Sequence, residues 1–442
     1  MTDAIFSQID FGPLKEFLVD ENVTDISYSN SGQVWLKTLD KGVYKVERPE
    51  INNPLMEKLA FQCSNVMGKT FNMAHPFLDA ESTELRMNFV HDSIATNGVA
   101  VLIRKTPAKI RLNREKLIDE EYLTADLNDF LNKCVVGHCN IIVSGETGSG
   151  KTELVKYLAS QTIENEKIIM IEDTLELHLD RIFPHRDIIA MKTNNIASYT
   201  EVLVTCMRQN PRWILLSEVR SAEAVMAVRN SISSGHNIIS TIHADKAQSI
   251  PMRMYSLLET QQDINQFLNS IHRYVQIGIH VRGYMSKTLN RFQREIQEVV
   301  EFFVNDENKP DMHIIYKKNN DGTFQLENPS KYLRGYLDIQ GITLPEEVFS
   351  STSGQMSARN IAGTESFNAT ANLANALNAE VTNEVANPAT ISQSQMATPD
   401  AIVEQVIEIP PVVLGGNIEA QPVNMQVPPV ENRPVFQEID AL

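Results

Sequence analysis

The segment Gly145–Thr152, which reads Gly-Glu-Thr-Gly-Ser-Gly-Lys-Thr, constrains the fold of this chain more than any other feature. It fits the pattern G-x-x-x-x-G-K-[ST], whose glycine-rich loop cradles phosphate groups when it joins a strand to a helix. The apolar run Ile141–Val143 precedes it, and residues 153–158 follow it with helical spacing. The glycines permit positive φ angles, so successive N–H groups can face phosphate oxygens. We therefore expect a phosphate-binding loop; a glycine-rich turn without a ligand is the alternative.

Every residue of this loop is a candidate contact to a nucleotide, and the expected ligands are ATP and Mg²⁺. Lys151 is expected to reach the β- and γ-phosphates, and the Thr152 hydroxyl to ligate Mg²⁺. The start of the following helix adds the positive end of its dipole. The candidate contacts are Gly145, Glu146, Thr147, Gly148, Ser149, Gly150, Lys151 and Thr152.

Short apolar runs without alternation recur after residue 125, and segments of helical spacing separate them. Such runs are typical of strands buried in a parallel sheet. This order predicts an α/β nucleotide-binding core over residues 125–351. Within it we expect a helix over 252–273 and further strands over 275–281 and 295–302. The four apolar runs are 140–144, 167–172, 213–217 and 237–241.

Residues 1–106 predict a small α+β domain, and residues 107–124 a linker that begins at Pro107. We expect an early amphipathic helix around Phe17, strands over 23–28 and 33–37 joined by a turn at 30–32, a helix over 54–67, and strands over 84–90 and 99–105.

The charge of the chain is unevenly distributed. Its 442 residues carry 39 Lys and Arg against 56 Asp and Glu, a net charge of −17. Residues 352–442 hold ten acidic residues and two arginines, so −8 lies there and −9 in the rest. This segment is rich in Pro, Ala and Asn and poor in aromatic residues, so we expect a disordered tail. The acidic balance argues against broad nucleic-acid binding, which needs a basic footprint.

The four cysteines, Cys63, Cys134, Cys139 and Cys206, form no pair of C-x-x-C motifs, so no zinc site is expected. The first residues lack the basic and apolar regions of a signal peptide. No apolar run approaches the roughly 20 residues of a membrane span. We therefore expect a cytoplasmic protein that reaches a membrane only through partners.

Carboxylates follow the second and third apolar runs, where the carboxyl ends of parallel strands bind ligands. Glu172 and Asp173 are candidate Mg²⁺ ligands; the alternative is that Asp173 caps a turn. Glu218 is the candidate for positioning the attacking water. The alternative for Glu218 is an ion pair with Arg220. The residue before Glu218 is Ser217, whereas P-loop ATPases usually have Asp at that position. We therefore expect Thr152 and water to supply most of the Mg²⁺ ligands.

Histidines and arginines complete the candidate set. His243, at the carboxyl end of the fourth run, could contact the γ-phosphate. For His236, at the other end of that run, a structural role and a functional role are equally expected. Arginines often stabilise the charge of a transferring phosphate. We expect two or three of five arginines to touch nucleotide: Arg86, Arg104, Arg208, Arg212 and Arg220.

Four segments now stand in one order: GETGSGKT, IEDTLEL, ILLSEVRSAEA and SGHNIISTIHAD. This order resembles the secretion-superfamily traffic ATPases of type II and type IV secretion, over roughly residues 20–305. The absence of cysteines beyond Cys206 and the short N-terminal domain resemble the type IV secretion and conjugation branch. Two features depart from the family pattern: Ser217 in place of the usual Gly, and the acidic tail.

The resemblance implies a RecA-like P-loop ATPase core behind the small N-terminal domain. It assigns Glu172, Asp173 and Glu176 to the Asp box, and Glu176 becomes the second candidate for positioning water. Glu218 and Arg220 match the Walker B segment. The His box comprises His236 and His243, and the N-terminal arginines that reach nucleotide are Arg86 and Arg104.

The function implied is Mg²⁺-dependent ATP hydrolysis by a homo-oligomeric ring, a hexamer, that powers type IV secretion or conjugative transfer, including pilus biogenesis. Its partners would be inner-membrane components of that machine, at the cytoplasmic face of the inner membrane, with no direct contact to nucleic acid. Three alternatives stay open: a type IV pilus assembly or retraction motor, a nucleic-acid translocase, and a nucleotide-gated scaffold.

Overall fold

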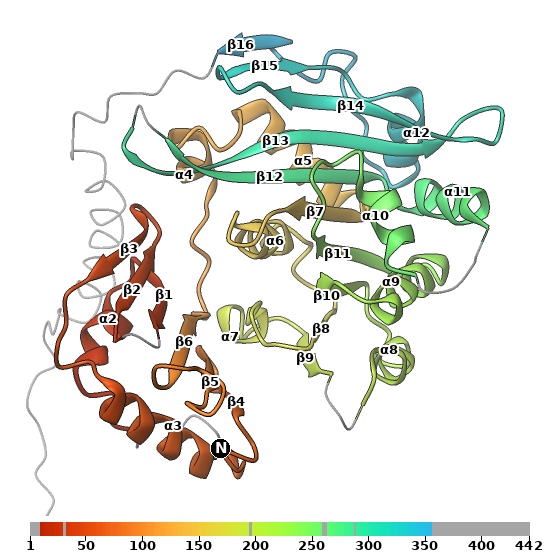
Figure 1. Ribbon diagram of the computed structural model, residues 1–442. Helices are drawn as coiled ribbons and strands as arrows, with labels where there is room; N and C mark the ends of the chain where they lie inside the picture. Colours follow the sequence, from red (N-terminus) through yellow and green to blue (C-terminus); the bar gives the residue numbers. More distant parts are fainter. Residues whose placement is uncertain (1–8, 30–31, 194–196, 259–262, 287–288, 356–442) are drawn as a thin grey trace, which may run out of the picture. The chain divides into compact units, whose positions relative to one another are not determined.

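The computed structural model describes residues 9–29, 32–193, 197–258, 263–286 and 289–355, which form two β-sheets with their helices (Figure 1). All of these residues belong to one compact unit of the chain, residues 1–360. Two expectations fall largely outside the described ranges: the turn at 30–32 and the disordered tail.

The first sheet has six strands in the order β3-β2-β1-β6-β5-β4, all antiparallel to their neighbours. Its helical elements are η1 (Gly12–Leu14), α2 (Lys15–Val19) and α3 (Asn53–Met67). The strands are β1 (Val23–Tyr28), β2 (Val34–Thr38), β3 (Gly42–Val46), β4 (Phe77–Glu81), β5 (Leu85–Val90) and β6 (Ala100–Lys105).

Helix α3 has strong local signals at both ends. The Asn52 side chain accepts a hydrogen bond from the Leu55 amide, and Pro54 lies in the first turn. Gly68 ends the helix at a φ of 59°, a conformation that glycine adopts without strain. The buried side chains of α3 pack with apolar residues of all of the strands except β3, whose Tyr44 and Val46 lie at the margin of this cluster.

Charged side chains lie side by side across the first sheet because successive residues of a strand point to opposite faces. Asp25 on β1 pairs with Lys37 on β2 and with Arg104 on β6. Arg104 pairs in turn with Arg86 on β5, which pairs with Glu81 on β4. These five residues are here called the charged row. Through them the first sheet takes part in the site described below.

The second sheet has ten strands in the order β16-β15-β14-β13-β12-β7-β11-β10-β8-β9. The six from β12 to β9 are parallel, and β13–β16 extend the sheet in antiparallel pairs. The strands are β7 (Ile141–Gly145), β8 (Ile168–Glu172), β9 (Ile188–Lys192), β10 (Trp213–Val219), β11 (Asn237–Ile242), β12 (Ile277–Ser286), β13 (Arg291–Val304), β14 (Pro310–Lys318), β15 (Thr323–Leu326) and β16 (Ser353–Gln355).

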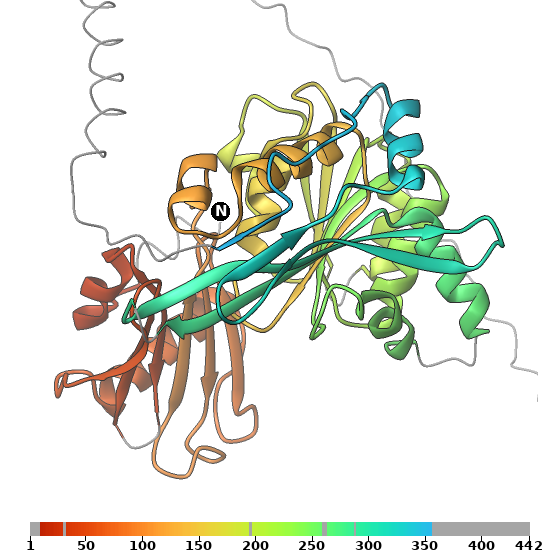
Figure 2. The same cartoon turned by 90° about the horizontal axis from the view of Figure 1, so that it is seen from above.

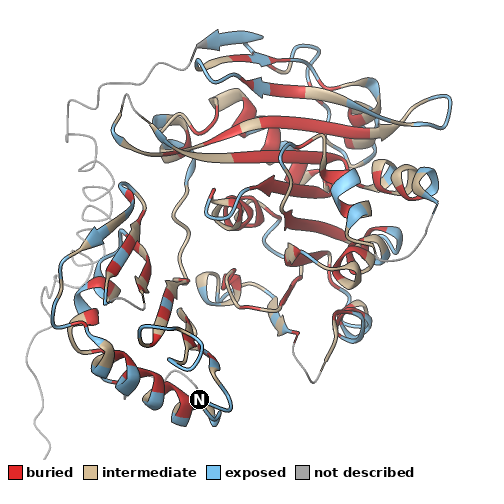
Figure 3. Ribbon diagram, viewed as in Figure 1, coloured by how far each residue is buried: buried red, intermediate tan, exposed pale blue. Residues whose placement is uncertain are grey.

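Helices cover both faces of this sheet (Figure 2). Ile141 and Val143 of β7 face a core shared with α4, α5, α6, α7 and α12, whereas Ile142 faces a core shared with α8 to α11. The central parallel strands β7, β8, β10 and β11 are buried nearly throughout (Figure 3), which explains why their sequences are apolar without alternation, whereas the edge strand β9 is partly exposed. The helices are α4 (Arg114–Asp119), α5 (Ala125–Val136), α6 (Lys151–Ser160), α7 (Leu179–Ile182), α8 (Tyr199–Met207), α9 (Ala222–Ser233), α10 (Ile250–Ser256), α11 (Ile264–Tyr274) and α12 (Lys331–Ile339).

The order of the parallel strands is that of a RecA-like core. Strand β7, which leads into the phosphate-binding loop, is separated from the acidic strand β10 by β11. The carboxyl ends of β7, β8, β10 and β11 therefore meet along one edge, where open α/β sheets bind ligands. The predicted fold class, a RecA-like P-loop core behind a small α+β domain, is confirmed.

The structure adds local elements that were not expected, and it divides one that was. Strands β3, β4 and β9 were not foreseen, because their sequences are short and partly polar. Helix α4 occupies the segment expected to be a linker, and Asn113 caps it by accepting from the Lys116 amide. The single helix expected over 252–273 is two, α10 and α11, and Asp263 caps the second. Strand β16 pairs with β15, so the ordered chain extends past residue 352.

None of the helices in the described ranges has the length and apolar character needed to cross a membrane.

Candidate nucleotide-binding site

The phosphate-binding loop runs from the end of β7 to the start of α6, as its sequence predicted. Gly148 has a φ of 80°, and a Cβ atom there would lie 2.3 Å from the Lys37 ammonium nitrogen. The left-handed backbone favours glycine at this position, and the missing side chain leaves room for the end of the Lys37 side chain. The loop keeps its backbone open on the side of the pocket, which Thr147 and Gly148 help to line.

The Lys151 ammonium is held inside this loop. Its Nζ donates to the carbonyl oxygens of Gly145 and Glu146, each at 2.9 Å, and lies 3.5 Å from Nδ1 of His243. Burial lowers the pKa of Lys151 to about 8, although the charges of Glu218 and Glu176 act in the opposite direction. A cation that has lost most of its water, and whose charge is only partly neutralised by nearby carboxylates, binds a phosphate anion strongly.

The ends of β10 and β11 bring a carboxylate and an imidazole together. Oε1 of Glu218 lies 2.8 Å from Nε2 of His243. Both residues line the same pocket as Lys151, Ser217 and Thr241. The contact orients the Glu218 carboxylate and leaves its second oxygen available to accept a proton.

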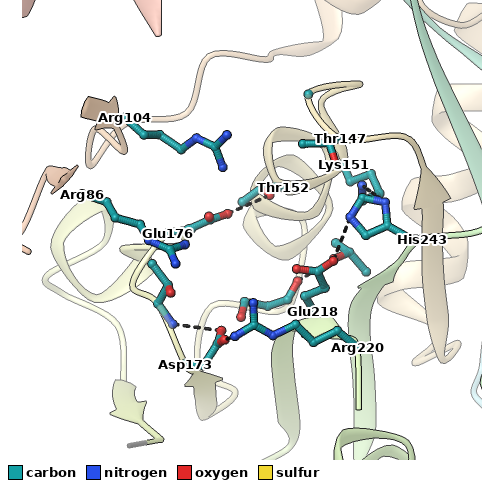
Figure 4. Close-up of a pocket in the computed structure, with 14 residues that line it drawn as sticks. Arg86, Arg104, Thr147, Lys151, Thr152, Asp173, Glu176, Glu218, Arg220 and His243 are labelled. Atoms are coloured by element: carbon teal, nitrogen blue, oxygen red, sulfur yellow. Dashed lines mark hydrogen bonds and ion pairs between the residues drawn. The ribbon is translucent and has the colours of Figure 1, made fainter. Parts of the chain in front are cut away.

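Two further carboxylates approach from the loop after β8. The Thr152 hydroxyl donates to Oε2 of Glu176 at 3.2 Å. Asp173 accepts from the Thr174 amide at 2.9 Å and forms an ion pair with Arg220. These residues all line the pocket, as Figure 4 shows. Glu218 therefore pairs with His243, and Arg220, its partner in the alternative interpretation, pairs instead with Asp173.

Arg86 and Arg104 of the charged row point from the first sheet into the same pocket (Figure 4). Nε of Arg104 donates to Oδ1 of Asp25 at 2.8 Å. Burial acts to lower the pKa of Arg104, but the hydrogen bond and charge of Asp25 outweigh it, so the pKa is raised. Arg104 thus stays cationic, and it faces the phosphate-binding loop from a different sheet.

Glu172, the other expected Mg²⁺ ligand, does not line the pocket. The residue is 1% exposed, and its Oε1 accepts hydrogen bonds from the amides of Glu176 and Leu177 at 3.0 and 3.1 Å. Burial raises its pKa to about 7 despite these two hydrogen bonds. Its geometry is that of a residue that shapes the loop carrying Glu176.

Replacing Glu172 by glutamine should therefore stabilise the protein at alkaline pH. The folded pKa lies above the ordinary 4.5, so the folded state binds the proton more tightly, and the resulting stability is lost as the pH rises through about 7. The charged form costs on the order of 3 kcal/mol. Glutamine stays neutral and can still accept both amides. Urea unfolding at pH 5 and pH 8 should show a smaller loss of stability in the variant than in the wild type. An equal loss of stability would contradict the raised pKa of Glu172, and an increased Mg²⁺ requirement in the variant would make Glu172 a ligand of the cation.

Other predicted residues lie away from the pocket. Nδ1 of His236 donates to the carbonyl oxygen of Pro211, 3.0 Å away, at the end of β11 opposite the pocket. Arg212 lies 3.9 Å from Glu166 at that same end, and Arg208 does not line the pocket. Only Arg220 of the three arginines near β10 reaches it. Within the loop, Gly145, Glu146, Ser149 and Gly150 shape the backbone rather than line this cavity.

Sequence reasoning missed several residues of an adjoining cavity, which shares Arg104, Lys151 and Thr152 with the first. It is lined by Lys37 and Asp25 of the charged row and by Arg294 of β13, whose Nη1 donates to the Leu39 carbonyl at 3.1 Å. The predicted strand over 33–37 could have placed Lys37 on the face of Asp25 by alternation. No local signal could have brought Arg294 to the loop.

The residues present fit a magnesium–nucleotide complex. Mg²⁺ prefers oxygen ligands and is usually bound by one or two carboxylates, waters and substrate phosphates. The pocket offers the Thr152 hydroxyl with the carboxylates of Glu176, Asp173 and Glu218, and the buried Ser217 Oγ, which has no hydrogen-bond partner in the described chain. Cations surround the same space: Lys151, Arg86, Arg104 and Arg220.

Together, strand order and pocket define a RecA-like P-loop ATPase. Residues 76–300, just over half of the chain, match the family described as Type II/IV secretion system protein. The chain belongs to this family, so the predicted resemblance is confirmed, as is the prediction of a nucleotide-binding ATPase.

Known relatives cover different shares of the chain. An uncharacterised protein of Bacillus anthracis is 29% identical over 66% of this chain and 66% of its own length. The type IV secretion system protein VirB11 of Bartonella henselae is 27% identical over 57% of this chain and 80% of its own. The solved VirB11 ATPase of Brucella suis, in complex with sulphate, is 23% identical with a TM-score of 0.35, over 67% of this chain and 93% of that one.

Proposed function

We propose that this protein hydrolyses ATP with Mg²⁺ and uses the energy to drive type IV secretion or conjugative transfer, including pilus biogenesis. The observation that carries the proposal is the convergence of Lys151, Glu218 and the Thr152–Glu176 pair with Arg86 and Arg104 in one pocket. Similarity to VirB11 proteins of type IV secretion systems supports the assignment to that kind of machine.

The geometry suggests a role for each group. Glu218, oriented by His243, accepts a proton from the attacking water. Lys151 and the arginines neutralise charge that develops on the phosphate oxygens, and they do so in fixed positions. Thr152, with Glu176 or Asp173, would hold Mg²⁺, which supplies Lewis-acid stabilisation of the phosphates when bound.

Arg86 and Arg104 lie on the first sheet, whereas the phosphate-binding loop lies on the second. Nucleotide bound between them would therefore favour their approach, and phosphate release would weaken it. We propose that this change moves the N-terminal domain (1–106) against the ATPase domain (125–351) in a homo-oligomeric ring, a hexamer. The ring would act at the cytoplasmic face of the inner membrane, on membrane components of the machine and without direct contact to nucleic acid.

Purified full-length protein should release phosphate from ATP over many turnovers, and EDTA should abolish the release. Size-exclusion chromatography with light scattering should give the mass of six copies. Binding without repeated turnover would indicate a nucleotide-gated scaffold instead. Strong stimulation by DNA would indicate a nucleic-acid translocase, and a pilus retraction defect on gene deletion would indicate the pilus motor.

A further inference from the structure

Ser217 is a buried polar residue in the nucleotide pocket with an unused hydroxyl. The residue is 7% exposed and lines the pocket beside Glu218. Its Oγ is shielded from solvent and makes no hydrogen bond to any residue of the described chain. Neighbouring hydroxyls differ: that of Thr152 donates to Glu176, and that of Thr241 to the Ser217 carbonyl.

A bulge in β10 explains how Ser217 and Glu218, adjacent in sequence, both reach the pocket. Leu216 pairs with Ser240 and Val219 with Ile242, so two residues of β10 face the single residue Thr241 of β11. Such a bulge interrupts the alternation of side chains and re-aims one of them. The Thr241 hydroxyl donates to the Ser217 carbonyl at 2.6 Å and so pins the backbone at this point.

A buried hydroxyl without a partner destabilises a protein, and such a group in a native pocket usually has a ligand or water to complete it. The next residue, Glu218, is already paired with His243. The oxygen of a neutral hydroxyl can accept a hydrogen bond, which suits a metal-bound water, because such a water has its two hydrogens to donate. The hydroxyl also adds no negative charge to a pocket that already holds Asp173, Glu176 and Glu218.

We propose that Ser217 is a positioning residue for the divalent cation: its hydroxyl hydrogen-bonds to a water in the Mg²⁺ shell of bound MgATP. The inference rests on the proposed function, because it requires a nucleotide with its cation in this pocket. In this proposal Ser217, at the end of β10 and next to Glu218, reaches the waters around the cation with its side chain.

The test measures binding of a fluorescent, non-hydrolysable ATP analogue to the full-length protein, with Mg²⁺ titrated and also in EDTA. Ser217→Ala should raise the Mg²⁺ concentration for half-maximal binding about 5- to 10-fold, the effect of one lost hydrogen bond. Binding in EDTA should not change. The urea midpoint should not fall, because the lost hydroxyl has no protein partner. Ser217→Thr, which keeps the hydroxyl, should restore the wild-type Mg²⁺ requirement.

Ser231→Ala is the matched control. Ser231 is a fully buried serine whose Oγ donates to the Ala227 carbonyl at 2.8 Å on α9, away from the pocket. It should lower the urea midpoint and leave the Mg²⁺ requirement unchanged. An unchanged Mg²⁺ requirement in Ser217→Ala, or equal weakening with and without Mg²⁺, would overturn the role of Ser217. Failure of the wild type to bind the analogue would overturn the nucleotide site itself.

Discussion

Lys151→Ala abolishes ATP hydrolysis: we expect kcat/KM to fall about a thousandfold or more, in the range of a lost charged contact to a transferring phosphate. The ammonium sits among the carbonyls of Gly145 and Glu146, facing the space for the phosphates. Alanine removes the cation and offers nothing in exchange. Phosphate release at saturating MgATP measures the effect.

The loss should come from the missing charge and not from unfolding. Burial already opposes the charged form of Lys151, as its pKa of about 8 shows, so alanine removes an unfavourable desolvation together with two hydrogen bonds. Lys309→Ala is the control, since Lys309 is 71% exposed and pairs with Glu307 at the surface. It should retain full activity. Turnover by Lys151→Ala above a tenth of the wild-type rate would refute the assignment of the phosphate site.

Glu218→Gln should bind ATP but hydrolyse it about 10²- to 10⁴-fold more slowly, the contribution typical of a general base. Glutamine has nearly the same shape and can still contact His243, but it cannot accept the proton of the attacking water. Single-turnover phosphate release measures the chemical step, and binding of the fluorescent analogue measures the affinity.

Glu307→Gln is the control for this substitution, because Glu307 is 72% exposed and lies on a β-turn between β13 and β14. Normal hydrolysis by Glu218→Gln would move the role of general base to Glu176. That carboxylate already accepts a hydrogen bond from Thr152 in the same pocket. Parallel measurement of Glu176→Gln would then decide between the two residues.

Much of the site could be predicted because its signals are local. A glycine-rich loop between strand and helix binds phosphate through its own backbone, so Lys151 and Thr152 need only their immediate neighbours to be recognised. Strand-end carboxylates are recognisable in the same way, and Glu218 and Asp173 lie where expected. Arg86 and Arg104, assigned through the family resemblance, also face the pocket.

Sequence order could not tell which of the neighbouring carboxylates faces the ligand. Glu172 and Glu176 are four residues apart, yet one is buried against backbone amides and the other lines the pocket. The turn of the loop between them decides this, and that turn depends on packing beneath it. Likewise, Arg212 and Arg220 flank the same strand, but opposite ends of a strand are far apart in space.

By itself, the sequence determined the phosphate-binding loop, the parallel core and the family, because each depends on short-range patterns of glycine, apolar runs and acidic strand ends. Only the tertiary structure decided the composition of the pocket. It brought Arg294 against a loop about 150 residues earlier in the chain, aligned Asp25, Arg104 and Arg86 across three strands, and placed both Ser217 and Glu218 at the pocket, next to a bulge in β10. Pairing between strands distant in the chain sets these positions, and local sequence does not record that pairing.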